Sequence, residues 1–323
     1  VCVLLSLSCG YRGPIYPPSP ELPVAITDLA AIERGNRLVI TFSAPTRTTD
    51  DLAIKRFSEI DLRIGPAPVP FDFGRWAAAA AQFQLNPPPP NDPDDPKPAL
   101  MTDSIPISEW LGQRIAVAVR TAVKKTGHYS QWSNRVVLEV IPPLQPPDAS
   151  AKATSQGVRL SWPSQGSEMH YRVLRKGPAD KTPVEVGTAE KNEYLDTTAQ
   201  YDTHYEYSVV AAETTAESLP SKSVDITPID IFAPSVPTGV TALATPESIE
   251  VSWQRSPESD LKGYYVYRSV SGGPFVRMGD LLTLPVYSDH SVEHGKTYRY
   301  AVSSIDQKGN ESEKSAPPVE VGF

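Results

Sequence analysis

The amino-acid sequence predicts an all-β protein in which three tandem β-sandwiches form an extended rod. Proline accounts for 34 of the 323 residues, about twice its usual share of ~5%, and proline interrupts helices. Short segments with every second residue apolar recur between clusters of Pro, Gly, Asn and Asp, a pattern typical of strands joined by turns. The chain also repeats itself internally, which indicates similar domains in series.

The composition excludes several classes of protein. The proline content argues against an all-helical fold and against enzymes built on long helices, such as Rossmann and TIM-barrel proteins. Acidic residues number 38 and basic residues 30, for a net charge of −8, so we expect no nucleic-acid partner. Hydrophobic residues make up 40% of the chain and only two residues are cysteines. Packed cores, rather than disulfides, must therefore stabilise the folded part.

The internal repeat is clearest in the second half of the chain. The residue pairs 93 positions apart are Tyr194 and Tyr287, Asp196 and Asp289, and Tyr205 and Tyr298. The matching segments are 157–162 with 248–253, 171–175 with 264–268, and 205–211 with 298–304. Each segment alternates with a period of two, so each is expected to be a strand with one buried face. In the third repeat the inward-facing residues would be Ile249, Val251, Trp253, Tyr264, Val266, Tyr298, Tyr300 and Val302.

These residues resemble the fibronectin type III fold. Its hallmarks here are Trp253 on the second strand, Tyr264-Tyr-Val266 on the third and Tyr298-Arg-Tyr-Ala-Val302 on the sixth. The segment that starts at Val292 and leads to Tyr298 is similar to the tyrosine corner, in which the tyrosine hydroxyl bonds to the backbone upstream. The second repeat has Ala199 at the position of Val292, so its corner is expected to be weaker.

The first repeat is more divergent. Residues 37–43 resemble the second strand, with Phe42 in the tryptophan position, and residues 60–64 resemble the third. Residues 115–119 resemble the sixth strand, with Ile115 in place of the corner tyrosine, and residues 130–140 the last strand. The resemblance here depends on order and pattern alone.

The proline-rich junctions define the expected domain boundaries. The predicted domains are residues 24–142, 146–228 and 234–321. Residues 141–147 and 227–234 join them without a glycine run, so both are expected to act as semi-rigid spacers. The predicted last strand ends close to Phe323, which favours a complete C-terminus.

An insertion of residues 71–100 interrupts the first domain. Its alanine-rich part predicts a short helix over about 74–84, because alanine is the best helix former. Trp76, Ala80 and Phe83 would then share one face of that helix. Trp76 and Phe83 either form a docking element for a partner or pack on their own sandwich, and the following Pro- and Asp-rich loop, 86–96, continues neither helix nor central strand.

The N-terminal residues indicate where in the cell the protein is located. Residues 1–8 fit the end of a signal peptide that is truncated at its start, and Leu5-Ser-Leu-Ser-Cys9 resembles a bacterial lipoprotein box. The resemblance implies that Cys9 carries acyl chains and anchors the chain in a bacterial envelope membrane, with 9–23 as a proline-rich tether. Gly10 after the cysteine favours the outer membrane or cell surface over the inner membrane. The alternatives are a signal peptide cleaved elsewhere and a Cys2–Cys9 disulfide.

The sequence contains no recognisable catalytic or cofactor motif. It lacks nucleophile-elbow, phosphate-loop and dinucleotide-binding patterns, so we expect no enzyme activity and no cofactor. His290 and His294 are four residues apart in an expected turn, and Asp92, Asp94 and Asp95 lack the spacing of a calcium loop. We therefore expect no metal site at either place.

One exposed surface deserves testing as a ligand site. If Tyr264 and Val266 face inward, then Tyr265, Tyr267 and Arg299 face outward on the third domain. Tyrosine and arginine are common in recognition surfaces, and the alternative interpretation is ordinary cross-strand packing.

The sequence thus favours a non-catalytic, membrane-anchored envelope lipoprotein that acts as a spacer and protein-interaction scaffold. Its partners would be envelope or surface proteins. Two alternatives remain: a polysaccharide- or cell-wall-binding protein that uses the Tyr265, Tyr267 and Arg299 surface, and an accessory fragment of a secreted hydrolase.

Overall fold

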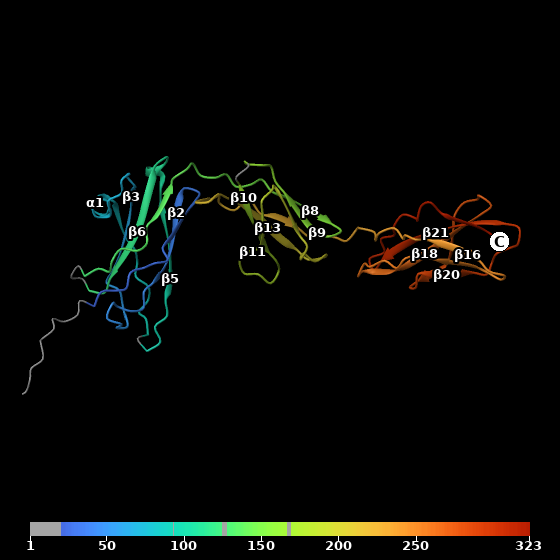
Figure 1. Ribbon diagram of the computed structural model, residues 1–323, viewed down its shortest axis with the longest axis horizontal. Helices are drawn as coiled ribbons and strands as arrows, with labels where there is room; N and C mark the ends of the chain where they lie inside the picture. Colours follow the sequence, from blue (N-terminus) through green and yellow to red (C-terminus); the bar gives the residue numbers. More distant parts are fainter. Residues whose placement is uncertain (1–20, 93, 125–127, 167–168) are drawn as a thin grey trace, which may run out of the picture.

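The computed structural model describes residues 21–92, 94–124, 128–166 and 169–323. The predicted anchor Cys9 lies outside these described residues. Three β-sandwiches follow one another along the long axis of the molecule (Figure 1), which confirms the predicted fold class. Each sandwich packs a sheet of three principal strands against a sheet of four.

Domain 1 contains the first seven strands and both short helices. One sheet has the order β1-β2-β5, with bounds Ala30–Arg34, Arg37–Ala44 and Ala99–Pro106. The other has the order β4-β3-β6-β7, with bounds Ala81–Gln84, Glu59–Pro66, Arg114–Ala122 and Val136–Glu139. Helix α1 spans Phe73–Ala79, and the 3-10 helix η1 spans Ser108–Trp110.

Domain 2 repeats this arrangement. Its smaller sheet has the order β12-β9-β8, with bounds Glu193–Asp196, Gly157–Ser161 and Ser150–Thr154. Its larger sheet contains β11, β10, β13 and β15, with bounds Val184–Ala189, His170–Lys176, Tyr205–Ala212 and Val224–Ile226. The two-residue strand β14, Ala216–Glu217, follows β13 in the same hairpin.

Domain 3 has the same two sheets. The smaller has the order β16-β17-β20, with bounds Thr241–Ala244, Ile249–Ser252 and Val286–Asp289. The larger has the order β19-β18-β21-β22, with bounds Val276–Leu282, Leu261–Val270, Thr297–Asp306 and Val319–Gly322.

The cores contain the residues that the alternation assigned to them. All eight inward-facing residues predicted for domain 3 belong to one buried cluster. Trp253 packs edge-on against Tyr264, with ring centroids 5.3 Å apart, and Trp162 does the same with Tyr171 in domain 2 at 5.0 Å. In domain 1 Phe42 is 1% exposed in the corresponding core, so phenylalanine fills the tryptophan position there.

The predicted helix over 74–84 is wrong in extent. Helix α1 ends at Ala79, and β4 begins at Ala81. Strand β4 pairs with β3, and this places Phe83 opposite Leu62. Pairing with the edge of an existing sheet outweighs the helix propensity of alanine, which is worth less than about 1 kcal/mol per residue. Trp76 and Phe83 therefore lie in different clusters rather than on one helix face.

Both predicted tyrosine corners are present. The hydroxyl of Tyr298 accepts a hydrogen bond from the backbone N–H of Glu293 at 2.8 Å, and that of Tyr205 accepts one from Gln200 at 3.1 Å. Ala199 occupies the position of Val292 in the second repeat, and the weaker corner expected there remains a prediction.

In every domain, two serines in the segment before the last strand form hydrogen bonds with the neighbouring long strand. Each serine donates its backbone N–H to the long strand β6, β13 or β21, and its hydroxyl accepts an N–H from the same strand. The pairs are Ser130 and Ser133, Ser218 and Ser221, and Ser312 and Ser315. The Ser-x-x-Ser spacing recurs in all three domains and is a sequence pattern that could have located this segment in each domain.

Domains 1 and 2 share one continuous sheet. Strand β14 of domain 2 pairs in parallel with β1 of domain 1, in the register Glu33–Ala216 and Arg34–Glu217. The eight-stranded sheet that results runs through both domains. The junction is thus held by backbone hydrogen bonds in addition to its proline-rich linker.

Domain 3 contacts domain 2 through the corresponding loop. The turn after β21 places Lys308 against Asp202, with Nζ and Oδ2 2.6 Å apart. The side-chain amide of Asn310 in the same turn donates to the carbonyl oxygen of Asp230 in the linker. The hairpin after the sixth strand thus contacts the preceding domain at both junctions.

Candidate functional site

The predicted ligand surface of domain 3 is partly assembled. Tyr265 and Tyr267 lie on the outer face of β18, and both are half-buried. Arg299 lies on the neighbouring β21, directly opposite Ser269 rather than beside either tyrosine. It lines a shallow pocket of about 400 Å³ with Ser271, Gly272, Thr297 and Glu320. The two tyrosines therefore share a surface, and Arg299 lies further along it.

Neighbouring side chains already engage both tyrosine rings. The Arg277 guanidinium lies 4.3 Å from the ring centre of Tyr265, and the Lys314 ammonium lies 4.4 Å from that of Tyr267. The Tyr267 hydroxyl donates to Glu311 at 2.5 Å. Partial burial and the Glu311 carboxylate raise the pKa of Tyr267 above its ordinary value. These contacts match the cross-strand packing interpretation.

Trp76 and Phe83, the two residues predicted as a docking element, pack in separate clusters. Trp76 is 4% exposed, and its indole N–H donates to the carbonyl oxygen of Gly65 at 3.3 Å. Its ring packs against Phe71 and Phe73. Phe83 packs edge-on against Trp110 in the main core. An open groove of about 990 Å³ runs beside α1, lined in part by the prolines at 66, 68 and 70.

The histidine and aspartates weighed as metal ligands in the sequence make contacts of other kinds. His294 stacks on Phe323 with ring centroids 4.6 Å apart. Asp95 pairs with Lys97, and Asp92 accepts the backbone N–H of Asp94. Within the described residues, two other groups bring three ligand-bearing side chains within 4.8 Å of one another.

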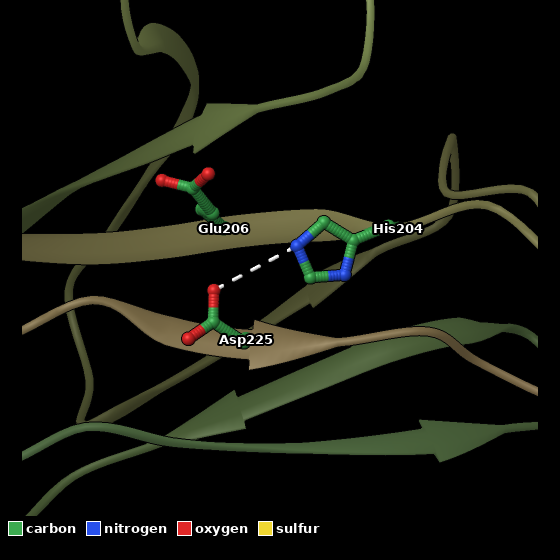
Figure 2. Close-up of side chains that lie close together, drawn as sticks. All are labelled: His204, Glu206 and Asp225. Atoms are coloured by element: carbon green, nitrogen blue, oxygen red, sulfur yellow. Dashed lines mark ion pairs between the residues drawn. The ribbon is translucent and has the colours of Figure 1, made fainter.

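One of these groups contains a histidine and two carboxylates. Glu206 lies on β13, Asp225 lies on β15, and His204 directly precedes β13; their side chains lie close together at the surface of domain 2 (Figure 2). The other group is Asp230, Asp260 and Asp306 at the junction of domains 2 and 3. The buried carboxylate of Asp306 already accepts hydrogen bonds from Gly309 and Asn310 in its own turn.

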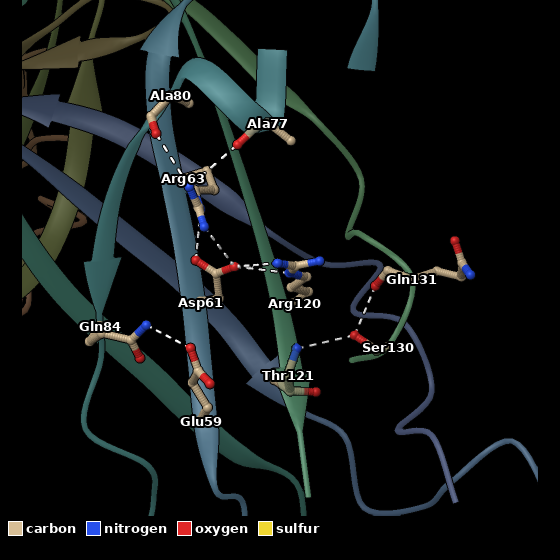
Figure 3. Close-up of polar contacts among 10 residues, drawn as sticks. All are labelled: Glu59, Asp61, Arg63, Ala77, Ala80, Gln84, Arg120, Thr121, Ser130 and Gln131. Carbon is tan, nitrogen blue, oxygen red and sulfur yellow. Dashed lines mark hydrogen bonds and ion pairs between the residues drawn. The ribbon is translucent and has the colours of Figure 1, made fainter. Parts of the chain in front are cut away.

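A polar network covers the outer face of domain 1. Asp61 is fully buried and forms ion pairs with Arg63 and Arg120 (Figure 3). The Arg120 guanidinium also lies over the rings of Tyr129, at 3.9 Å, and Trp132, at 4.4 Å. Burial, with a contribution from Glu59, raises the pKa of Tyr129 to about 12. This network was not predictable from the sequence, because Asp61 and Arg120 lie on different strands far apart in the chain.

Domains 2 and 3 each bury one aspartate in a matching network. The carboxylate of Asp289 accepts the Tyr300 hydroxyl at 2.7 Å, Arg268 at 2.8 Å, and both the N–H and the hydroxyl of Ser291. Burial by itself would raise the pKa of Asp289, but the hydrogen bonds outweigh it, so this pKa lies below its ordinary value. In domain 2, Tyr207 and Arg175 donate hydrogen bonds to the carboxylate of Asp196. The pKa of Asp196 likewise lies below its ordinary value.

Curated relatives include an exoglucanase and an amylopullulanase, each matched over part of this chain. The chain is 32% identical over 186 residues to exoglucanase B of Cellulomonas fimi, covering 54% of this chain and 16% of that protein. It is 37% identical over 91 residues to amylopullulanase of Thermoanaerobacterium saccharolyticum, covering 28% of this chain and 7% of that protein. The chain therefore spans less than a fifth of the length of either relative.

The arrangement of strands in each domain identifies the fold. No family model matches the chain. Each domain packs a sheet of three strands on a sheet of four, and domains 2 and 3 each contain a tyrosine corner. The chain is an array of three fibronectin type III-like sandwiches. A two-domain fibronectin type III segment of chicken tenascin is similar to it at 19% identity and a TM-score of 0.37, covering 56% of this chain and all of that one.

None of the described helices has the length and apolar character needed to cross a membrane. The matched segments of 186 and 91 residues are small parts of the exoglucanase and the amylopullulanase, 16% and 7% of their lengths.

Proposed function

We propose that this fibronectin type III-like array is a non-catalytic accessory segment of a secreted polysaccharide-degrading protein, in which it spaces and orients other domains. The supporting observation is the sequence similarity to segments of an exoglucanase and an amylopullulanase, each a small share of those proteins. An accessory fragment of a secreted hydrolase is one of the alternatives predicted from the sequence, and the similarity favours it over a membrane-anchored scaffold.

The arrangement of the domains suits a spacer. Backbone pairing between β14 and β1 fixes domain 2 on domain 1, and a polar contact at Lys308 links domain 3 to domain 2. Glycoside hydrolysis requires two carboxylates that are free to act on the substrate. The buried aspartates of the described residues, such as Asp61, Asp196 and Asp289, are instead committed to arginine and tyrosine partners.

The reading frame around this chain provides the direct test. We expect the frame to continue beyond the given sequence and to encode a catalytic domain, whereas the purified chain itself releases no reducing sugar from cellulose, starch or pullulan. A start codon close to Val1 together with a stop codon after Phe323 would contradict the hydrolase assignment. Hydrolysis by the purified chain would contradict the non-catalytic one.

We also retain, as a proposal, the lipid anchor at Cys9 and with it a location in the bacterial envelope. The lipoprotein-like Leu5-Ser-Leu-Ser-Cys9 supports it, since two or more acyl chains on one residue suffice for stable anchoring. Expression of the precursor in a bacterial host should give an intact mass that includes the acyl chains and a protein that partitions into detergent. The Cys9→Ser variant should lose both properties, and an unmodified wild-type mass would rule the anchor out.

Binding of polysaccharide through Tyr265, Tyr267 and Arg299 has less support than the accessory role. Arg277 and Lys314 already lie over the two tyrosine rings, so a sugar ring would have to displace a cation or use the opposite ring face.

A further inference from the structure

The strongest unassigned group of side chains lies at the edge of the larger sheet of domain 2. Glu206 on β13 stands directly opposite Asp225 on the edge strand β15. His204 is two residues before Glu206, so both side chains project from the same face of the sheet. The imidazole Nε2 of His204 lies 3.8 Å from Oδ1 of Asp225, as Figure 2 shows. This group was not predictable from the spacing of its members, because Asp225 follows Glu206 by 19 positions. The segment that contains Ser218 and Ser221 lies between them.

The other two domains have different residue pairs at the position of Glu206, which directly follows the tyrosine-corner residue. In domain 3 this position is Arg299, which lies opposite Glu320. In domain 1 it is Ala116, which lies opposite Val137. Those pairs are oppositely charged or apolar. Domain 2 alone has two carboxylates there, although like charges directly opposite each other destabilise a sheet. A positive charge at this place would relieve the repulsion.

The ligand set indicates which positive charge fits. One imidazole nitrogen and two carboxylates form a typical ligand set for zinc and similar divalent transition metals, whereas calcium and magnesium prefer oxygen alone. Tetrahedral ligand atoms that each lie about 2.1 Å from a zinc ion are about 3.4 Å apart. The three ligand atoms lie within 4.8 Å of one another. Side-chain rotations that bring these atoms closer by about 1.5 Å or less would therefore close the site.

A lysine currently shares one of the ligands. The Lys176 ammonium on β10 lies 3.2 Å from Oε1 of Glu206, and this residue stands opposite Glu206 in the sheet. Lysine therefore offsets part of the negative charge and competes with a metal for that oxygen. It does not contact Asp225 or His204 through any ion pair of the described residues.

We propose that His204, Glu206 and Asp225 form a binding site for a divalent transition-metal ion, for which zinc is the probe. The three side chains supply three ligands on one face of the sheet edge, and water fills the open positions of the ion. A bound ion neutralises the facing carboxylates of β13 and β15 and so stabilises this edge of domain 2.

The test is a calorimetric zinc titration of the full chain, with the thiols of Cys2 and Cys9 blocked because thiolates also bind zinc. We expect one zinc ion whose affinity falls at least about tenfold in each of His204→Ala, Glu206→Gln and Asp225→Asn. The Lys176→Met variant should bind zinc more tightly, because the competing ammonium is gone. Magnesium should give no saturable binding at the same concentration.

Two controls make the test decisive. His290→Ala removes an exposed histidine of domain 3 and should leave the zinc affinity unchanged. Zinc should also raise the unfolding temperature of the wild type, because a ligand that binds only the folded state stabilises it, and this rise should be absent in His204→Ala. Equal zinc binding by the wild type and the three ligand variants, or the absence of binding by the wild type, would overturn the site.

Discussion

Replacement of Asp289 by alanine is expected to lower the free energy of unfolding of domain 3 by about 3–5 kcal/mol. The Asp289 side chain is 1% exposed and accepts hydrogen bonds from Tyr300 and Arg268. Without the carboxylate, the Tyr300 hydroxyl loses its partner inside the sandwich, and the Arg268 guanidinium loses its ion pair and keeps only its hydrogen bonds to Ser291. The loss of a partner from a buried charge costs far more than the pair itself contributes.

Calorimetric unfolding of the full chain measures this effect, because domain 3 should unfold at a lower temperature while domain 1 is unchanged. Asp196→Ala is the matched variant and should destabilise domain 2 in the same way, through Tyr207 and Arg175. Glu293→Ala removes a carboxylate from an exposed ion pair with Lys296 and should leave the stability of domain 3 nearly unchanged, because solvent screens such a pair. Equal effects of Asp289→Ala and Glu293→Ala would contradict the role assigned to the buried network.

The same carboxylates determine the response to acid. The folded-state pKa of Asp196 and that of Asp289 lie below the ordinary value of 3.8. Such a group contributes its full stabilisation above the unfolded pKa, and this contribution is lost as the pH falls from that value through the lower folded pKa. Domains 2 and 3 should therefore become less stable below about pH 4, and the Asp289→Asn variant should show a weaker dependence in domain 3.

Replacement of Glu217 by alanine is expected to release domain 2 from domain 1. Its carboxylate, 9% exposed, binds Arg34 of domain 1 at 2.8 Å and Arg172 of domain 2 at 2.7 Å. Loss of these charge-assisted bonds should weaken the docking of the two domains by about 1–3 kcal/mol. The two arginines would then also repel each other.

Distances between spin labels on domains 1 and 2 provide the measurement. The distribution should be narrow in the wild type and broad in Glu217→Ala, and protease should cut the linker 142–147 faster in the variant. Glu193→Ala breaks an exposed ion pair with Arg159 within domain 2 and should leave the distribution unchanged. A narrow distribution in Glu217→Ala would show that the backbone pairing of β14 with β1 is sufficient by itself.

Much of the fold could be predicted because it depends on local patterns. Alternation along single strands identified the inward-facing residues around Trp253 and Tyr264, and the repeat spacing aligned domain 2 with domain 3. The tyrosine corners were predictable for the same reason, since the hydroxyl of Tyr298 reaches a backbone group only five residues away. Each of these features is encoded within a few residues.

The sites were less predictable because they join distant parts of the chain. Burial of Asp61 between Arg63 and Arg120 requires knowledge of which strands are neighbours. Phe83 shows the same limit on a local scale, because pairing of β4 with β3 displaced the helix that alanine propensity favours.

Three similar all-β domains are predictable from the amino-acid sequence, since period-two alternation and proline-rich junctions are local properties of the chain. The way in which those domains join, and the places where their ligand-bearing side chains meet, depend on the three-dimensional structure. The pairing of Arg34 with Glu217 and that of Glu206 with Asp225 arise from contacts between separate strands. Such contacts depend on sheet register and domain docking, which neighbouring residues in the sequence do not encode.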